Sequence, residues 1–165
     1  MQGSEAVNIA LLIVDMQIEF LQDRPVTTAS AYINHTAQIV RSGGHPVIHI
    51  QDVEEAGTIS PERLAFIPEI QVEKDDLIVK KTFSNAFWQT ELEQILLDRQ
   101  IGFVVIAGFD AGNCVLFTYN GAIERGLKAA ILQHGILSAK EDLVALMYRD
   151  RHVISYPVIE FMVQS

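Results

Sequence analysis

Apolar runs of strand length alternate with segments of helical period along the chain, and this alternation constrains the fold more than any other feature. The run Ile9 to Val14 is followed by the helical pattern of Tyr32 to Val40 and then by the run Val47 to Ile50. The later strand candidates are Leu77 to Val79, Phe103 to Ala107, Ala129 to Leu132 and Val153 to Tyr156. Because most of these runs are apolar on both faces, the pattern predicts an α/β fold with six mostly parallel strands between two layers of helices.

Length and composition indicate one globular domain over residues 1–165. Apolar residues make up 49% of the chain and charged residues 20%, a balance that excludes disorder. The formal charge of −9 opposes binding to nucleic acid or to an anionic membrane surface, because both carry negative charge. The first segment, MQGSEAVNIALLIVD, lacks the basic flank and the cleavage site of a signal peptide, so we expect a soluble cytoplasmic protein.

Reactive side chains follow three of the predicted strands, and open parallel sheets bind ligands where their strands end. Asp15 closes the first strand, Lys80 and Lys81 close the third, and Cys114 follows the fourth. Asp15 leaves a buried run, so we expect a partly desolvated carboxyl group with a raised pKa. The alternative for such an aspartate is a turn cap or a pairing with a surface lysine. No G-x-G-x-x-G motif or P-loop follows any predicted strand, which argues against nucleotide binding.

Cys114 is the only cysteine, which excludes an internal disulfide. It lies in the first turn of a helix predicted from Asn113 to Arg125, where free amides and the helix dipole favour a thiolate and lower its pKa. Gly108 and Gly112 allow a sharp strand-to-helix turn and a close approach of the backbone to a ligand. These features favour a nucleophile over a core side chain. A redox thiol is a further alternative, although no second cysteine could resolve its oxidised form.

The two adjacent lysines cannot both face one site, because neighbouring residues of an extended segment point to opposite sides. Lys80 and Lys81 therefore remain alternatives on geometry alone. The connection from Glu54 to Asp76 is long for a compact domain, and such loops are commonly functional. Gly121, inside the helix predicted after Cys114, indicates close packing.

Three segments together resemble the signature blocks of the isochorismatase-like cysteine hydrolases. They are IALLIVDMQIEF, VKKTFSNAFWQTELEQIL and IGFVVIAGFDAGNCVLFTYNGAIERGLKA. The resemblance spans nearly the whole chain, and each block contains the predicted end of a strand. It implies a three-layer α/β/α fold with an open, Rossmann-like sheet in the order 3-2-1-4-5-6.

The resemblance also implies a catalytic triad, which falls on Asp15, Lys81 and Cys114. Lys81 is favoured over Lys80 because its distance to Phe87 matches the commoner family spacing. The implied reaction is hydrolysis of a C–N bond, amide or carbamoyl, in a small-molecule substrate through a thioester on the cysteine. Cleavage of isochorismate itself needs no cysteine in the family members that perform it.

The residues before the nucleophile carry further implications of the resemblance. A cis peptide bond would join Phe109 to Asp110, and the backbone amides of Asp110 and Cys114 would form the oxyanion hole. The chain departs from the family pattern at Ala111, where threonine is usual, and at Asp110, whose charge lies beside the proposed oxyanion hole. Phe20 follows the first block and is the expected substrate-binding aromatic residue.

We expect no cofactor and no metal. Nicotinamidases of this family hold a metal through an aspartate and histidines after the second strand, whereas Asp52 has no histidine downstream in its loop, and His45 and His49 precede it. The alternative to an enzyme is an inactive family member that acts as a binding or scaffold module. We also expect a homodimer or higher homo-oligomer, which is usual in the family.

Overall fold

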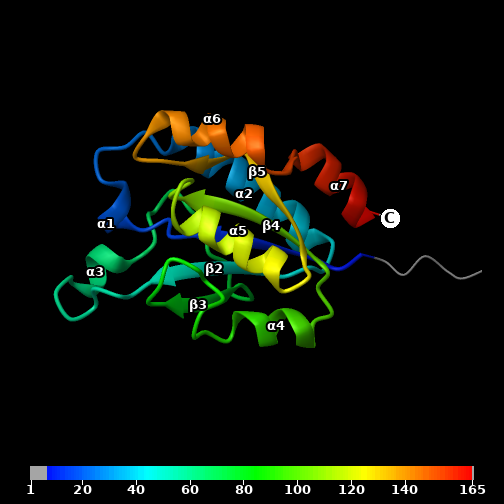
Figure 1. The fold of residues 1–165 in the computed structure, drawn as a ribbon, viewed down its shortest axis with the longest axis horizontal. Helices are drawn as coiled ribbons and strands as arrows, with labels where there is room; N and C mark the ends of the chain where they lie inside the picture. The colour runs from blue at the N-terminus through cyan, green and yellow to red at the C-terminus, as the bar shows by residue number, and fades with distance from the viewer. Residues whose placement is uncertain (1–6, 165) are drawn as a thin grey trace, which may run out of the picture.

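The structure, a computed structural model, describes residues 7–164. Its six strands form one sheet in the order β3-β2-β1-β4-β5-β6, and every pairing is parallel. The strands are β1 (Ile9–Val14), β2 (Val47–Asp52), β3 (Leu77–Lys81), β4 (Phe103–Phe109), β5 (Lys128–Leu137) and β6 (Val153–Ile154). The helices are α1 (Ile18–Leu21), α2 (Thr27–Ser42), α3 (Pro61–Leu64), α4 (Leu92–Asp98), α5 (Cys114–Glu124), α6 (Glu141–Asp150) and α7 (Tyr156–Gln164). The predicted three-layer fold and sheet order are confirmed (Figure 1).

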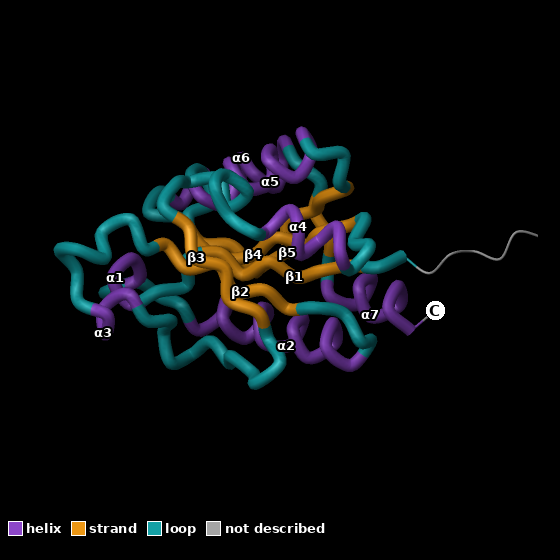
Figure 2. The backbone as a smooth tube through the Cα atoms, turned by 90° about the horizontal axis from the view of Figure 1, so that it is seen from below, coloured by secondary structure: helices purple, strands orange, loops and turns teal. Residues whose placement is uncertain are grey.

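Strand β1 shows why a continuous apolar run forms the centre of the sheet. Successive side chains of a strand point to opposite faces, and every residue of β1 is buried. Ala10, Leu12 and Val14 join the core under α4, α5 and α6, whereas the alternate residues join the core under α2 and α7. Figure 2 shows these two helical layers on opposite sides of the sheet. Burial on both faces places β1 at the centre of the sheet, and Asp15 follows it directly.

Strand β1 has the predicted bounds, β2 to β5 run further than the sequence pattern predicted, and β6 is shorter. β2 reaches Asp52 and β3 reaches Lys81, so both polar ends still belong to the sheet. The predicted last strand, Val153 to Tyr156, is wrong in its second half, because β6 ends at Ile154 and α7 begins at Tyr156. The Ser155 carbonyl accepts hydrogen bonds from the amides of Val158 and Ile159, three and four residues later, and these bonds begin the helix.

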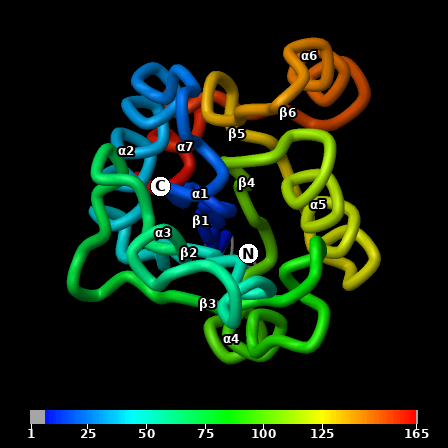
Figure 3. Tube along the Cα trace, turned by 90° about the vertical axis from the view of Figure 1, so that its left-hand side faces the viewer, coloured from blue at the N-terminus to red at the C-terminus, as the bar shows by residue number. Residues whose placement is uncertain are grey.

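The short helices α1 and α3 lie beyond the carboxyl ends of the strands, as the end-on view shows (Figure 3). The segment after β1 and the connection between β2 and β3 are joined there by two backbone hydrogen bonds, from Ile18 N to Ala65 O (2.9 Å) and from Ile67 N to Met16 O (2.9 Å). This end of the sheet is thus a layer of connected loops. Among the helices of residues 7–164, none has the length and apolar character needed to cross a membrane.

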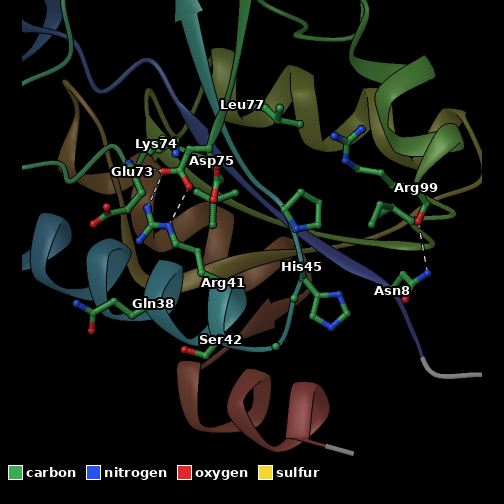
Figure 4. A pocket seen from close by; sticks show the side chains of 16 residues that line it. Asn8, Gln38, Arg41, Ser42, His45, Glu73, Lys74, Asp75, Leu77 and Arg99 are labelled. Atoms are coloured by element: carbon green, nitrogen blue, oxygen red, sulfur yellow. Dashed lines mark hydrogen bonds and ion pairs between the residues drawn. The ribbon is translucent and has the colours of Figure 1, made fainter.

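The two described cavities lie away from the carboxyl ends of the central strands. One, of about 850 Å³, is formed at the opposite end of β1, β2 and β3, where Arg41, Glu73 and Lys74 line its wall (Figure 4). There the Arg41 guanidinium binds both carboxylate oxygens of Asp76, at 2.8 and 2.6 Å. The other cavity, of about 640 Å³, lies beside β6 and α7. Neither is lined by the candidate triad.

Candidate active site

The ammonium group of Lys81 lies at the centre of a cluster of polar side chains at the carboxyl ends of the strands. Its Nζ is 3.1 Å from Asp15 Oδ2, 2.9 Å from Asp52 Oδ2 and 3.5 Å from Cys114 Sγ. Lys81 and Asp15 are buried, with 1% and 2% of their surface exposed. The structure thus brings together the three residues of the predicted triad and adds Asp52, which the sequence did not place there.

The alternation of side chains along β3 decides which lysine reaches this cluster. β3 is an edge strand in which Val79 and Lys81 are buried while Ile78 and Lys80 are exposed. Because neighbouring residues point to opposite faces, Lys80 is directed to solvent. Lys81 is therefore the lysine of the cluster, in the position that the family spacing favoured.

Asp15 leaves β1 in a left-handed backbone conformation with φ of 53°. Aspartate adopts this region more readily than most residues. Its amide donates to the Ile50 carbonyl at 3.0 Å, which keeps the turn attached to β2. The turn directs the carboxylate toward Lys81 instead of continuing the alternation of the strand.

Cys114 is the first residue of α5, as the sequence predicted, and its side chain is half-buried. The peptide bond between Phe109 and Asp110 is cis, which confirms that implication of the family resemblance. The Asp110 carbonyl then accepts the amides of Asn113 (3.0 Å) and Val115 (3.1 Å), which curls the chain from β4 into α5. First-turn amides of a helix have no acceptor within the helix, so the Cys114 amide suits an oxyanion-binding role.

The glycines of this turn serve packing against protein. At Gly108 the φ is +113°, and a Cβ would overlap the backbone carbonyl of Val14 on β1. At Gly112 a Cβ would overlap the side chain of Leu143 on α6. At Gly121 it would lie 2.5 Å from Asn85 Oδ1, which confirms the close packing predicted there. At Gly108 and Gly112 the space that a Cβ would need is thus filled by β1 and α6, and the approach of this backbone to a ligand stays a prediction.

Asp52 reaches Lys81 because the register of β2 and β3 pairs the two residues directly. Gln17, fully buried, holds the backbone of Asp52 on both sides: its Nε2 donates to the Asp52 carbonyl at 2.9 Å and its Oε1 accepts the Asp52 amide at 2.7 Å. Sequence reasoning considered Asp52 only as a metal ligand and did not consider Gln17. The available signal was that Asp52, like Lys81, ends a strand, and that Gln17 follows Asp15 by two residues.

The protonation states follow from burial and from the balance of charges. Burial raises the pKa of Asp15 to about 6, although Lys81 and Cys114 favour its carboxylate form. Burial alone would lower the pKa of Lys81, but Asp15, Cys114 and Asp52 raise it above its ordinary value. Burial, reinforced by the negative charge of Asp15, raises the pKa of the Cys114 thiol to about 12 against the opposing effect of Lys81. At neutral pH Asp15 is therefore a carboxylate, Lys81 an ammonium and Cys114 a neutral thiol.

The predicted lowering of the Cys114 pKa is therefore wrong for the free protein. A helix N-terminus contributes about 0.3–1 kcal/mol toward an anion at exposed positions. Desolvation and the adjacent Asp15 carboxylate act in the opposite direction and are stronger here. The thiol consequently needs a base to give up its proton, and Asp15 is the carboxylate next to it.

The Asp110 carboxylate is engaged by the loop after β5. Its Oδ1 accepts the Ser138 hydroxyl at 2.6 Å and the Gly112 amide at 3.2 Å. Ala111, in the place where the family usually has threonine, is fully buried, and its amide donates to the Leu137 carbonyl at 2.8 Å. These contacts orient the Asp110 side chain toward β5 and α6, on the side of β4 opposite to β1 and β3.

Phe20 lies half-buried on α1, and its ring stacks on Phe109 with centroids 6.4 Å apart and planes inclined by 16°. The Arg24 guanidinium lies over the same Phe109 ring at 5.4 Å. Phe20 thus contacts the residue immediately before Asp110. Its role in substrate binding remains a prediction.

Asp15, Asp52 and Cys114 also offer three potential metal-ligating atoms, all within 4.8 Å of one another. The Lys81 ammonium, however, lies within reach of all three. A divalent cation bound to them would have to displace a buried, charge-paired ammonium. Asp15, Asp52 and Cys114 therefore suit the ammonium group of Lys81 and do not suit a metal ion.

Fold and cluster together are typical of α/β-class hydrolases that use a cysteine. A model of the isochorismatase domain matches residues 9–152, and the chain therefore belongs to the isochorismatase family, a family of hydrolases. It is 27% identical over 150 residues to the isochorismatase family protein YaaI of Bacillus subtilis, covering 81% of this chain and 82% of YaaI. It is also 27% identical over 129 residues to streptothricin hydrolase of Streptomyces noursei, covering 74% of this chain and 51% of that protein.

Solved structures show the same fold. An isochorismatase-like hydrolase from Alkaliphilus metalliredigens superposes with a TM-score of 0.81 at 23% identity, covering 93% of this chain and 98% of that one. N-carbamoylsarcosine amidase from Thermoplasma acidophilum superposes with a TM-score of 0.78 at 22% identity, covering 91% and 97%. These likenesses concern the arrangement of strands and helices.

Proposed function

We propose that the chain is a cysteine-dependent hydrolase that cleaves a C–N bond, amide or carbamoyl, of a small molecule through a thioester on Cys114. One observation carries the proposal: the buried Lys81 ammonium contacts both the Asp15 carboxylate (3.1 Å) and the Cys114 sulfur (3.5 Å). A carboxylate, a cation and a thiol in contact supply a base, a charge balance and a nucleophile.

In the first half of the proposed reaction Asp15 accepts the thiol proton while Sγ of Cys114 attacks the substrate carbonyl carbon. Lys81 stabilises the negative charge that passes from the carboxylate to the sulfur. The backbone amides of Asp110 and Cys114 would donate hydrogen bonds to the resulting oxyanion, each worth about 3 kcal/mol. Asp15 then gives its proton to the leaving nitrogen, the C–N bond breaks, and the acyl group remains on sulfur.

In the second half a water molecule attacks the thioester carbonyl, and Asp15 accepts a proton from that water. The acid product leaves, the sulfur recovers the proton, and the cluster returns to its resting state. Asp15 suits both transfers because its pKa of about 6 makes it ionised at neutral pH yet still able to donate a proton.

The relatives support hydrolysis and leave the substrate open. Streptothricin hydrolase and N-carbamoylsarcosine amidase are hydrolytic by name, and the second acts on an amide-type bond. A C–N substrate is favoured over isochorismate because the cluster contains a cysteine whose sulfur lies within 4.8 Å of an oxygen of its base, Asp15.

A panel of primary amides, carbamoyl compounds and isochorismate tests the proposal by the release of ammonia or acid. Hydrolysis of an amide or carbamoyl compound is expected from the wild-type protein and not from Cys114→Ala. Mass spectrometry of the protein during turnover should detect the added mass of the substrate's acyl group on the wild-type protein and not on Cys114→Ala. Turnover by Cys114→Ala at the wild-type rate would contradict the thioester mechanism.

A non-catalytic binding or scaffold module is the competing function. The raised pKa of Cys114 favours it, because a resting thiol is a poor nucleophile until a substrate is bound. Binding of a panel compound without turnover, equally tight in wild-type and Cys114→Ala, would support the module and not the hydrolase.

A further inference from the structure

The cluster contains a fourth residue that the proposed reaction does not use directly. We infer that Asp52 is a positioning residue: it holds the Lys81 ammonium within reach of Asp15 and Cys114, and its negative charge close to the sulfur opposes a second negative charge there. The role of Asp52 in the reaction rests on the proposed function. Its effect on Lys81 and on the thiol concerns the protein without substrate and does not depend on that function.

The hydrogen bonds of Lys81 show why Asp52 is needed to hold it. An ammonium group has three N–H donors, and Lys81 Nζ has three acceptors, at 2.9 Å in Asp52, 3.1 Å in Asp15 and 3.5 Å in Cys114. Asp52 is the nearest of them. Without its carboxylate a fully buried cation would keep one N–H unpaired and only one counter-charge, so its position between Asp15 and Cys114 would no longer be determined.

Asp52 is itself held rigidly. Gln17 binds both its backbone amide and its carbonyl, and the same Gln17 Nε2 also donates to the Leu64 carbonyl at 2.8 Å. The Asp52 Oδ1 atom accepts the Glu54 amide at 2.9 Å, which leaves Oδ2 directed at Lys81. The position of the carboxylate is thus set by the turn after β1 and by the loop after β2, before any substrate is present.

The charges of the cluster explain the second effect of Asp52. Three charged groups face the sulfur: Asp15 after β1, Asp52 from β2 and Lys81 from β3. The carboxylate of Asp110, after β4, is instead bound by the Ser138 hydroxyl. Two carboxylates against one ammonium already leave the centre of the cluster negative, and a thiolate would add a further negative charge. The Asp52 charge also raises the pKa of Asp15, which makes Asp15 a stronger base for the thiol proton.

The test compares Asp52→Asn with Glu54→Gln. The second variant also removes one carboxylate charge, but from an exposed side chain two residues further along the chain. The rate at which iodoacetamide alkylates Cys114 is measured by mass spectrometry at a series of pH values. This rate reports the ionisation of the thiol and requires no substrate. We expect slow alkylation of wild-type and Glu54→Gln at neutral pH. In Asp52→Asn the alkylation profile should move to lower pH, with a rate about tenfold higher for each unit by which the thiol pKa falls.

The activity of the same variants gives a second readout once a substrate is known. Asp52→Asn is expected to lower kcat more than it raises KM and to move the acidic limb of kcat/KM to lower pH. Should Asp52→Asn not fold, as judged by circular dichroism, Asp52→Ser removes the same charge with a smaller side chain.

The amide oxygen introduced by Asp52→Asn can still accept a hydrogen bond from Lys81, so this variant removes the charge and leaves the ammonium in place. An alkylation profile of folded Asp52→Asn that coincides with that of Glu54→Gln, or that moves to higher pH, overturns the inference. For Asp52→Ser, a profile that coincides with that of Glu54→Gln overturns it. This outcome is independent of the proposed function, because alkylation requires no turnover. Conversely, a protein with no C–N hydrolase activity could still show the shifted profile, in which case the proposed function fails and the assignment of Asp52 stands.

Discussion

At the scale of single residues, the proposed chemistry depends on Lys81, whose charged group lies between two carboxylates and a thiol. A buried ammonium of this kind is stable only because its counter-charges are buried with it. The neighbouring Lys80 has the same side chain, one position earlier on the same strand, and points to solvent. The pair therefore offers a matched comparison of charge with position.

Lys81→Met is expected to lower kcat/KM by about 100-fold or more, because the charge that balances Asp15 and the thiolate is lost. Lys80→Met should retain kcat/KM within about twofold, since an exposed lysine contributes little to a buried site. Steady-state kinetics on the active panel compound measures both, with thermal unfolding to verify that each variant is folded. Equal losses in the two variants would contradict the assignment of Lys81.

The pKa of Asp15 predicts the acidic limb of the pH profile. Because burial raises this pKa to about 6, the carboxylate needed to accept the thiol proton predominates only above that pH. Activity should therefore rise as pH increases through about 6. Initial rates of kcat/KM measured across this range test the expectation. A limb near pH 4, the ordinary range of an exposed aspartate, would show that another group acts as the base.

At the scale of elements, the position of the nucleophile depends on how closely β4 approaches β1. Gly108 pairs with Val14 in the parallel ladder and has a φ of +113°, which L side chains rarely adopt. A side chain at this position would separate the ends of the two strands that carry Asp15 and Cys114. The glycine thus allows the close approach of β4 to β1 beside Asp15.

Gly108→Ala is expected to cost about 1–3 kcal/mol in backbone strain, with a further loss from overlap with β1. Gly102→Ala is the matched control, because a Cβ there meets nothing within 4 Å. Urea unfolding of both variants measures the difference. Equal unfolding midpoints would show that β4 can move away from β1 at little cost.

The long connection between β2 and β3 is fixed at its far end by Asp76. Arg41 on α2 binds this carboxylate bidentately, and His49 on β2 approaches it at 2.9 Å. Burial alone would raise the pKa of Asp76, but the Arg41 guanidinium, the Glu73 amide and His49 hold it below its ordinary value. A carboxyl group with a depressed pKa stabilises the fold above its unfolded pKa and loses this contribution as pH falls through the folded value.

Asp76→Asn is accordingly expected to lower the free energy of unfolding by about 1–3 kcal/mol at neutral pH. The difference from wild type should narrow as pH falls below about 4, because the aspartate of the unfolded chain takes up a proton there while the folded carboxylate keeps its charge to lower pH. Asp75→Asn, at an exposed position, serves as the control. Urea unfolding at several pH values provides the measurement, and a difference independent of pH would argue against the ionic contribution.

At the scale of the whole molecule, several aromatic side chains are exposed around the segment after β3 and on α5. Trp88 and Phe117 are each 52% exposed, and Phe83 packs edge to face on Trp88. The Ala86 amide donates to the Thr118 hydroxyl at 3.1 Å, which joins this segment to α5. Exposed apolar surface of this kind is typical of association sites.

We therefore expect sedimentation velocity at micromolar concentration to show a species of at least twice the mass of one chain. Phe117→Ser should shift the distribution toward the monomer if α5 lies in the contact. Phe161→Ser, on α7, tests the opposite face of the sheet. A monomer at these concentrations would contradict the predicted homo-oligomer.

The features predicted from sequence are those that arise from local pattern. Continuous apolar runs identify β1 and β4, because a strand buried on both faces has no polar position to interrupt it. The same pattern places Asp15 directly after the first strand and Cys114 at the start of the helix that follows the fourth. The limits of the elements were predicted less well, since Tyr156 begins a helix where the run of residues suggested a strand.

What only the tertiary structure decided are properties that depend on neighbouring strands. The register of β2 against β3 brings Asp52 to Lys81, and the covered face of the edge strand selects Lys81 over Lys80. Cys114 begins its helix where the sequence indicated, but burial beside Asp15 raises its pKa, opposite to the prediction from the helix dipole. Local sequence determines which residues reach the carboxyl end of the sheet. Pairing and burial determine which of them meet and which carry a proton, because electrostatic energies depend on distances between residues far apart in the chain.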